Sequence, residues 1–474
     1  MASSALVTTV SPLQYLQQRF SIIDLSGELR VIDERQITGV INGSIRGEPA
    51  FYKRVDGNQI MRRYLETLPI HSNSKSEIEN FWNSAATIMY TSTSFDPRAT
   101  VNTSLNFWVG PTDNPTPGNW MLIRNYLRDV ICDGNSETYE YLIRYLAHMI
   151  QYPEEKPGVM LVLLGGQGTG KGIYFSLLRA IWPRTTLQVS KIDQVVGRFT
   201  SALERNYIVC MDEALFAGDR QAIDNLKSIV TEQYLHIEQK YQPSRTIESF
   251  HRLFAASNHE HFAHVESDDR RFVFLRVSNK RQKDTVYFSG IAKAISNPKI
   301  VSAILYYLSK KDLSQFNVRI KPQTTEQLSQ KIKSLQGFER FWFEVLGNTD
   351  QHKLELFDEW RQSIFVSTAS LIHKYKLFNT GSERYQPLQS SQILETIKRL
   401  CPSALTGVRE TVCNHDKSEQ LRGVRLPTLA IARNEFSAYL GQLIAWDEMD
   451  LPEVINGVDV IGVSDAEIAT EDTI

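Results

Sequence analysis

A glycine-rich turn followed by a lysine is the part of this chain best suited to chemistry. Residues 161–164 are Leu-Val-Leu-Leu, and the turn that follows holds Gly165, Gly166, Gln167, Gly168, Thr169, Gly170, Lys171 and Gly172. Glycines allow the backbone to curl so that successive N–H groups point at an anion. Lys171 adds a mobile charge suited to the β- and γ-phosphates of a nucleotide. The spacing G-x-x-x-x-G-K, placed between an apolar run and a helical pattern, therefore predicts an ATP-binding loop.

One position departs from the usual phosphate-binding loop. The residue after the lysine is Gly172, whereas a Ser or Thr hydroxyl at this place normally ligates Mg²⁺. We therefore expect Mg²⁺ to be held by phosphate oxygens, water molecules and Asp212. The simpler alternative is a glycine turn that occurs here by chance.

Two carboxylates end the next apolar strand. Residues 206–211 are Asn-Tyr-Ile-Val-Cys-Met, and Asp212 and Glu213 follow them. After a phosphate-binding loop, Asp212 is suited to hold Mg²⁺ through water, and Glu213 to polarise the attacking water as a general base. In isolation, an Asp-Glu pair after an apolar run more often caps a helix.

Polar residues also flank two later strands. Residues 252–258 are Arg-Leu-Phe-Ala-Ala-Ser-Asn, which predicts a largely apolar strand that ends at Asn258. The amide of Asn258 could orient a lytic water beside the γ-phosphate. Arg270 and Arg271 precede a further apolar run, and an arginine that reaches a neighbour's γ-phosphate stabilises transition-state charge. The simpler alternatives are a turn asparagine and surface ion pairs with the preceding aspartates.

Cations in two predicted β-structures are candidates for contact with DNA. Residues 235–250 predict a β-hairpin with Lys240 and Arg245 near its tip. Near the C-terminus, two predicted helices precede a wing-like strand at 421–427, which carries Arg422 and Arg425. This order resembles a winged-helix DNA-binding module. The alternatives are solvated surface cations and a small helical domain that docks on the rest of the chain.

Composition limits the class of protein. The chain has 474 residues, of which 42% are apolar and 22% charged, and this predicts a soluble protein of several domains. A formal net charge of −2 argues against a globally basic nucleic-acid binder but allows cations focused in a channel. No apolar stretch approaches the roughly 18 residues of a membrane span, and the start of the chain lacks a secretory signal pattern. The four cysteines form no CxxC pair, and this fits a reducing, cytoplasmic setting. Because no membrane span is predicted, we expect no membrane partner.

The order of these motifs within residues 165–272 resembles that of the superfamily-three helicases, the AAA+ ring ATPases of viruses and mobile elements. The loop sequence GGQGTGKG looks more like the helicase part of phage and plasmid primase-polymerase–helicases, which are related to the poxvirus primase-helicase. Segments at residues 95–110 and 145–153 are also similar to that family.

The resemblance implies a role for each candidate residue. Asp212 and Glu213 would form the Walker B pair, and Asn258 would be sensor 1. Arg270 would be the arginine finger with Arg271 as the second candidate, and Lys240 would take the DNA-contacting hairpin position. The helices at 120–151 would form an oligomerising collar. Because only about 90 residues precede the family segment, we expect a stand-alone helicase or a truncated primase-helicase, with a primase or polymerase as a candidate partner.

The predicted fold class is α/β, with an AAA+ P-loop ATPase core, a helical collar before it and a winged-helix-like α+β domain after it. The predicted parts are a small α+β region at 1–110, the collar at 111–155, the motor at 156–310, a linker at 311–336, the winged-helix-like domain at 337–458 and an acidic tail at 459–474.

The sequence thus predicts an ATP- and Mg²⁺-dependent ring, expected to be a hexamer, that translocates on single-stranded or forked DNA. It would unwind DNA during replication of a phage or mobile element. Two other classes stay open. One is an origin-binding initiator or duplex-DNA translocase that does not separate strands, and the other is a non-motor AAA+ switch in phage defence.

Overall fold

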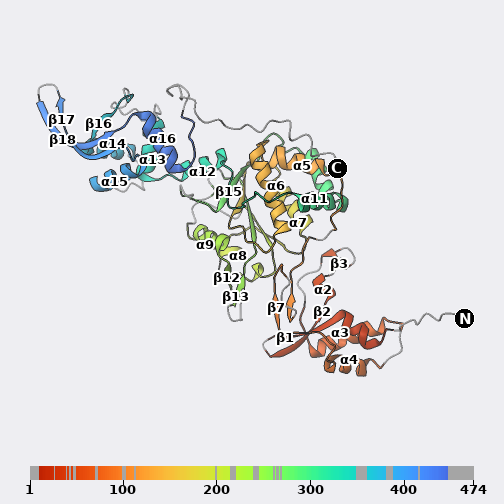
Figure 1. Cartoon of the computed structure of the whole chain (residues 1–474). Helices are drawn as coiled ribbons and strands as arrows, with labels where there is room; N and C mark the ends of the chain where they lie inside the picture. The colour runs from red at the N-terminus through yellow and green to blue at the C-terminus, as the bar shows by residue number, and fades with distance from the viewer. Residues whose placement is uncertain are drawn as a thin grey trace. The chain divides into compact units, whose positions relative to one another are not determined.

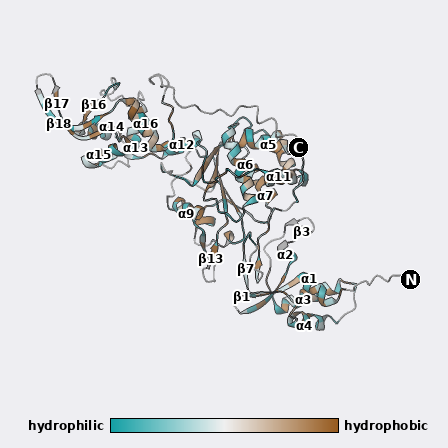
Figure 2. Cartoon of the chain, viewed as in Figure 1, coloured by the Kyte–Doolittle hydropathy of each residue, from teal (hydrophilic) through white to brown (hydrophobic). Residues whose placement is uncertain are grey.

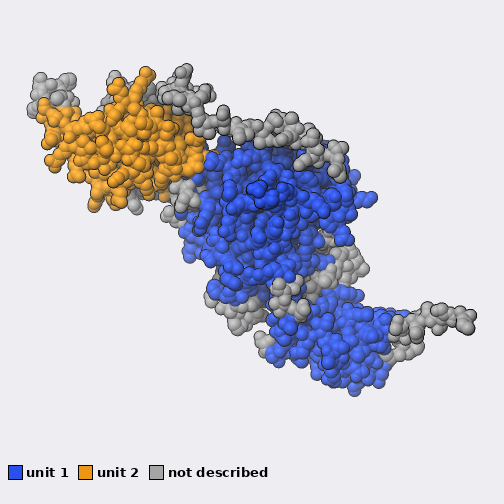
Figure 3. Space-filling model, in the orientation of Figure 1, with its two compact units in different colours: residues 1–334 blue, residues 335–474 orange. Residues whose placement is uncertain are grey.

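The computed structural model describes residues 10–25, 27–38, 40–41, 44–45, 50–69, 73–98, 103–111, 114–197, 200–213, 220–238, 245–259, 262, 266, 269–347, 360–379, 388–414 and 417–446. The chain divides into two compact units, Met1–Ser334 and Leu335–Ile474 (Figure 3). The predicted acidic tail lies outside the described residues. Within the described part of the chain, no helix has the length and apolar character needed to span a membrane.

The N-terminal part of unit 1 is a small sheet covered by helices. The sheet has the order β5-β2-β1-β6, with β1 antiparallel to β2 and parallel to β6. Side chains alternate along β1, so Phe20 and Ile22 face the helices while Ile23 packs against Leu105 and Phe107. The elements are α1 (Pro12–Arg19), β1 (Phe20–Leu25), β2 (Glu28–Asp33), α2 (Arg35–Thr38), β3 (Val40–Ile41), β4 (Ser44–Ile45), β5 (Tyr52–Lys53), α3 (Arg54–Glu66), α4 (Ser74–Asn83), β6 (Met89–Tyr90), β7 (Ser92–Ser94) and β8 (Ser104–Asn106).

A five-stranded parallel sheet forms the centre of unit 1. Its order is β10-β11-β14-β9-β15, so the strand β14 lies between β9 and β11. The strands are β9 (Met160–Leu164), β10 (Thr186–Val189), β11 (Ile208–Asp212), β14 (Arg252–Ser257) and β15 (Phe272–Arg276). Every residue of β9 and β14 is buried, as expected of parallel strands covered on both faces. Figure 2 shows the same pattern as hydrophobic colour along the strands near the centre of unit 1.

Two layers cover the central sheet. In β9, Leu161 and Leu163 join the core on one face, while Met160, Val162 and Leu164 join the core on the other. The first face carries α5 (Met121–Asn125), a π-helical turn (Tyr126–Ile131), α6 (Ser136–Gln151), α7 (Lys171–Ile181), α10 (Thr285–Ile295) and α11 (Pro298–Lys310) (Figure 1). The second carries α8 (Asp193–Val196), a 3₁₀ turn (Ser201–Leu203), α9 (Arg220–Thr231), β12 (Tyr234–Ile237) and β13 (Arg245–Glu248).

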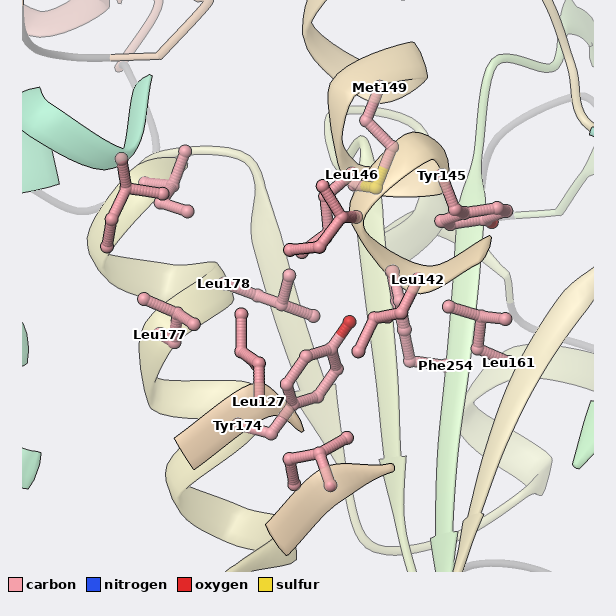
Figure 4. Packing of buried hydrophobic residues seen from close by; sticks show 14 of the residues in the cluster. Leu127, Leu142, Tyr145, Leu146, Met149, Leu161, Tyr174, Leu177, Leu178 and Phe254 are labelled. Atoms are coloured by element: carbon pink, nitrogen blue, oxygen red, sulfur yellow. The ribbon is translucent and has the colours of Figure 1, made fainter. Parts of the chain in front are cut away.

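The helices predicted as a collar share the core of the central sheet. Nine of the sixteen residues of α6 are buried. Leu142, Tyr145 and Leu146 of α6 pack in one cluster with Tyr174 of α7 and Phe254 of β14 (Figure 4). The boundary predicted at 155/156 therefore does not separate two cores. The apolar face of α6 is buried within its own chain by α7, α11 and the central sheet.

The segment predicted as a linker, residues 311–336, belongs to unit 1 up to Ser334, and its helix packs on the central sheet. It contains α12 (Thr325–Ser334), which packs on β15. The guanidinium of Arg276 lies 2.5 Å from the carboxylate of Glu326, whose side chain is only 4% exposed. The Nζ atom of Lys321 donates to the backbone oxygens of Asp269 (2.6 Å) and Phe272 (2.9 Å). The segment is polar, but several side chains of α12, among them Glu326 and Gln330, are buried because ionic and hydrogen-bond partners compensate them.

Unit 2 is a helical domain with a three-stranded antiparallel sheet of order β16-β18-β17. The predicted order of two helices followed by a wing strand is present. Aromatic side chains, among them Phe338, Phe341 and Trp342 of the first helix, form much of its core. The elements are α13 (Gly337–Gly347), β16 (Ile364–Ser367), α14 (Thr368–Phe378), α15 (Ser390–Leu400), β17 (Leu405–Asn414), β18 (Lys417–Leu426) and α16 (Leu429–Leu440).

Candidate nucleotide site

The glycine-rich turn connects β9 to α7 and forms a tight loop. Gly168 and Gly170 have φ angles of +77° and +98°, which are accessible to glycine but strained for other residues. Thr169 is fully buried, and its hydroxyl donates to the oxygen of Gly166 at 2.9 Å. Gly170 is the N-cap of α7, so the loop ends where the unpaired N–H groups and positive dipole end of this helix begin. Such a helix start is a ready anion site.

Lys171 lies folded against this loop. Its Nζ atom donates to the backbone oxygens of Gly165 (2.7 Å) and Gly166 (2.9 Å) and to Oδ1 of Asn258 (2.7 Å). The residue is 7% exposed. Burial lowers the pKa of Lys171, and the carboxylates of Glu213 and Asp212 oppose that shift. The ammonium group therefore lies between the phosphate loop and the two carboxylates.

The amide of Asn258 joins Lys171 to Glu213. Its Oδ1 accepts from Lys171, and its Nδ2 donates to Oε1 of Glu213. This contact follows from the strand order. β14 lies between β9, which precedes the loop, and β11, which precedes Glu213, and the carboxyl ends of these three parallel strands lie at the same end of the sheet. The structure thus brings together three of the residues that the sequence singled out.

The backbone at Glu213 is in an unusual conformation. Its φ angle is +53°, in the left-handed region that costs a non-glycine residue roughly 1–2 kcal/mol. The backbone N–H of Glu213 donates to the oxygen of Ala256 at 3.0 Å, which holds this turn against β14. The conformation directs the carboxylate to the amide of Asn258. A strained residue held by its surroundings is a frequent feature of functional sites.

Asp212 ends β11 beside β10. Its Oδ2 accepts from Nε2 of Gln188 at 3.2 Å, and Oε1 of Gln188 accepts from Nη2 of Arg179 at 2.8 Å. Among the described residues, no group of three or more His, Cys, Asp and Glu side chains could hold a metal ion alone. A Mg²⁺ ion shared with nucleotide phosphates needs only one or two protein carboxylates, and Asp212 fits that need. Gly172 adds no ligand, and a Cβ there would meet nothing within 4 Å.

Residues that the sequence reasoning missed form hydrogen bonds to the loop, Gln282 from the solvent side and Tyr126 from the core. The Nε2 atom of Gln282 donates to the oxygen of Gln167 (2.9 Å), and the backbone N–H of Lys283 donates to the oxygen of Gly168 (2.9 Å). The hydroxyl of Tyr126, in the π-helical turn, donates to the oxygen of Gly170 at 2.9 Å. No local pattern marks these side chains, because they come from segments some 40 and 115 residues away.

We expect Gly170→Ala to disturb the loop far more than Gly172→Ala. At Gly170 a Cβ would lie 2.5 Å from Cε1 of Phe288, and the φ angle of +98° disfavours any side chain. At Gly172 the added methyl has open space, and alanine favours a helix over glycine by about 1 kcal/mol. Thermal unfolding and binding of a fluorescent ATP analogue would check this, with Gly172→Ala as the matched control. Equal effects of the two substitutions would contradict the described loop geometry.

The two candidate finger arginines lie where the parallel strands begin, whereas Lys171 lies beyond the carboxyl ends of these strands. They precede β15, which runs parallel to β9 with Phe272 opposite Met160, and the N–H of Met160 donates to the oxygen of Arg271. The five residues of β9, at about 3.3 Å each, separate the two ends of the strand by about 16 Å. Arg270 is exposed and Arg271 is half-buried. Neither arginine therefore reaches the phosphate loop of its own chain.

The candidate DNA contacts are described only in part. β12 and β13 pair antiparallel, so the predicted hairpin is present, but Lys240 lies outside the described residues. Arg245 begins β13, and its side chain is also outside them. In unit 2, Arg422 is exposed, whereas Nε of Arg425 donates to Oε1 of Glu410 at 2.7 Å. Arg425 thus already has a carboxylate partner, which the sequence analysis did not anticipate.

Comparison with known proteins places the chain near a phage replication protein. A family profile described as a family of unknown function (DUF5906) matches residues 163–271, the stretch that holds the loop, Asp212, Glu213 and Asn258. A DNA primase-polymerase of Nitratiruptor phage NrS-1 is 27% identical over 161 residues, which are 33% of this chain and 22% of that protein. The chain thus spans about a fifth of that relative's length.

Solved structures of the C-terminal region of NrS-1 cover most of this chain. The apo structure gives a TM-score of 0.61 at 16% identity and covers 88% of this chain and 99% of that chain. An A-form apo structure gives a TM-score of 0.60 at 15% identity, covering 87% and 98%. The chain shares this mixed α/β fold. Its parallel central sheet and its similarity to a phage DNA primase-polymerase agree with the coarse features predicted from the sequence.

Proposed function

We propose that this chain is an ATP-driven DNA translocase and helicase of the AAA+ superfamily-three type that works in the replication of a phage or mobile element. The observation that carries the proposal is the amide of Asn258, which contacts both Lys171 and Glu213. Asn258 thus joins a cation suited to phosphate, Lys171, to a candidate general base, Glu213, beside the glycine-rich loop. ATP hydrolysis requires groups of these two kinds. Similarity to a phage DNA primase-polymerase supports the replication context.

The residues of the site divide the work of hydrolysis. The N–H groups at the start of α7 and the ammonium of Lys171 would bind the β- and γ-phosphates. Glu213 would accept a proton from the attacking water, and Asn258 would keep this carboxylate and the γ-phosphate in register. Asp212, oriented by Gln188, would hold Mg²⁺. When bound, that ion neutralises charge on the phosphate oxygens.

A ring of subunits would complete the site. Because Arg270 and Arg271 lie about 16 Å along the sheet from the loop of their own chain, an arginine finger would have to reach the nucleotide of a neighbour. Charge stabilisation supplied by such a residue can be large in phosphoryl transfer. Arg270 is the better candidate because it is the more exposed of the two. We propose a closed homo-oligomer, with a hexamer as the expected form.

A hairpin variant separates a DNA motor from an ATPase that only switches between states. We expect Lys240→Ala to leave ATP turnover without DNA unchanged and to lower its stimulation by single-stranded or forked DNA, because the lysine would grip backbone phosphates. Phosphate release with and without DNA, and strand displacement on a forked substrate, are the measurements. Unchanged stimulation and unwinding would remove the hairpin from the proposal. If DNA did not change phosphate release by the wild-type protein, the non-motor switch would be favoured. If DNA stimulated phosphate release without strand displacement, a duplex translocase would be favoured.

A further inference from the structure

The long hairpin of unit 2, β17 with β18, carries different chemistry on its two faces. Directly paired residues of an antiparallel ladder project to the same face. The outer pairs Arg409–Arg422 and Thr411–Gln420 therefore share one face, and the intervening pairs Glu410–Leu421 and Val412–Glu419 share the other. Both acidic side chains of this region lie on the second face. The first face presents, among its described side chains, two guanidinium groups and neutral polar groups.

Arg409 and Arg422 are directly opposite one another, and both are exposed. Two like charges in this position destabilise a hairpin unless an anion lies between them. Among the described residues no ion pair joins either arginine to a carboxylate, whereas Arg425 on the other face lies against Glu410. The guanidinium of Arg422 lies near Gly407, where a Cβ would be 3.6 Å from its Nη2. The backbone bulge between Thr406 and Val408 thus leaves room for this side chain.

The arginine face points to the same side of the sheet as the helices. Val424 and Leu426 alternate with Arg422 along β18 and are buried in the core, so Arg422 projects to the helical side. Helix α14 packs on β18, and α15 packs on β17. The two strands extend beyond these helices as a projecting arm (Figure 1). The arginine pair therefore faces the corner between this arm and α15.

We propose that Arg409 and Arg422 form a paired site for backbone phosphates of a nucleic-acid duplex lying against this corner of unit 2. The paired guanidinium groups can each bind phosphate oxygens bidentately, and such contacts fix a protein on a duplex without reading its sequence. The proposal deepens the nucleic-acid part of the proposed function but does not require ATP hydrolysis. It replaces Arg425 by Arg409 as the partner of Arg422.

The salt dependence of binding tests the pair. Each phosphate contact contributes about 0.9 to the slope of log K against log salt for duplex DNA. In the full chain without nucleotide, we expect Arg409→Ala/Arg422→Ala to lower the magnitude of that slope by about 1.8. Fluorescence anisotropy of a labelled duplex over a range of NaCl concentrations measures it. DNA and RNA duplexes of one sequence would show which of the two supplies the phosphates, and a loss on either supports the site.

Two matched variants keep the test specific. Arg425→Ala removes the same charge from the same hairpin on the opposite face, and we expect it to keep the wild-type slope. Arg409→Lys/Arg422→Lys keeps both charges and should restore most of the slope. An unchanged slope in the double alanine variant, or an equal loss in Arg425→Ala, would overturn the proposal. ATP turnover of the same proteins without DNA is an independent measurement, so loss of the ATPase assignment would not be mistaken for loss of this site.

Discussion

Lys171→Ala is expected to abolish ATP turnover. The ammonium group donates to Gly165, Gly166 and Asn258 at 2.7–2.9 Å and lies where the loop amides and α7 begin. A hydrogen bond to a charged group contributes about 1.5–3 kcal/mol. Loss of one such bond to a phosphate therefore weakens ATP binding by about 10- to 150-fold, and loss of transition-state stabilisation lowers turnover further. Binding of a fluorescent ATP analogue and steady-state phosphate release are the measurements.

Two further variants separate chemistry from folding. Lys171→Ala removes both the donor of three hydrogen bonds and the packing of the aliphatic part of the side chain. Lys171→Met removes the same donor but keeps that packing, so it should show the same loss of turnover with a smaller loss of thermal stability. Lys310→Ala removes an exposed lysine at the end of α11 and should behave as the wild type. Retained turnover in a folded Lys171 variant would mean that the loop is not the ATP site.

Glu213→Gln is expected to retain ATP binding and to lose hydrolysis. The substituted amide can still accept the hydrogen bond from Nδ2 of Asn258, so the geometry of the bridge is kept while the basic carboxylate is lost. General-base catalysis contributes about 10²–10⁴-fold, and we expect single-turnover hydrolysis to fall by that factor. ATP affinity should change little, because Glu213 faces Asn258 and the phosphates are bound by the loop.

The control for this substitution is Glu137→Gln, which changes an exposed carboxylate in the first turn of α6. It should leave both ATP affinity and hydrolysis unchanged. A normal single-turnover rate in Glu213→Gln would assign the proton to another acceptor. If affinity and rate fell together, Glu213 would act in nucleotide binding instead.

The motifs that resemble one helicase family could be found from the sequence, because the residues of each motif are close together in the chain. Residues 165–172 are recognisable as a candidate anion-binding loop from local sequence, because such a loop requires glycines and a lysine at fixed spacing. The strand that ends at Asp212 and the strand that precedes Asn258 were also visible as apolar runs followed by polar residues. Since parallel strands share one carboxyl edge, the meeting of these side chains followed from the predicted sheet.

The sequence was least informative where partners are distant in sequence. Residues 311–336 have the polarity of a solvated linker, yet Glu326 is buried by a contact with Arg276, fifty residues away. The helices at 120–151 matched the position of a collar, but their apolar faces pack on the chain's own sheet. The sequence made Arg425 a candidate DNA contact, and only the structure shows that Glu410 of β17 lies against it. In each case polarity was visible in the sequence and the partner was not.

The sequence by itself determined the glycine-rich loop between a strand and a helix, the polar residues at the ends of β11 and β14, and the helix–helix–wing order near the C-terminus. These depend on short-range spacing and hydrophobic periodicity. Only the tertiary structure decided that Asn258 bridges Lys171 and Glu213, that Tyr126 and Gln282 contact the loop, and that Arg270 lies at the other end of the sheet from the loop of its own chain. Those relations depend on strand order and on packing between segments up to about 115 residues apart, which no local pattern specifies.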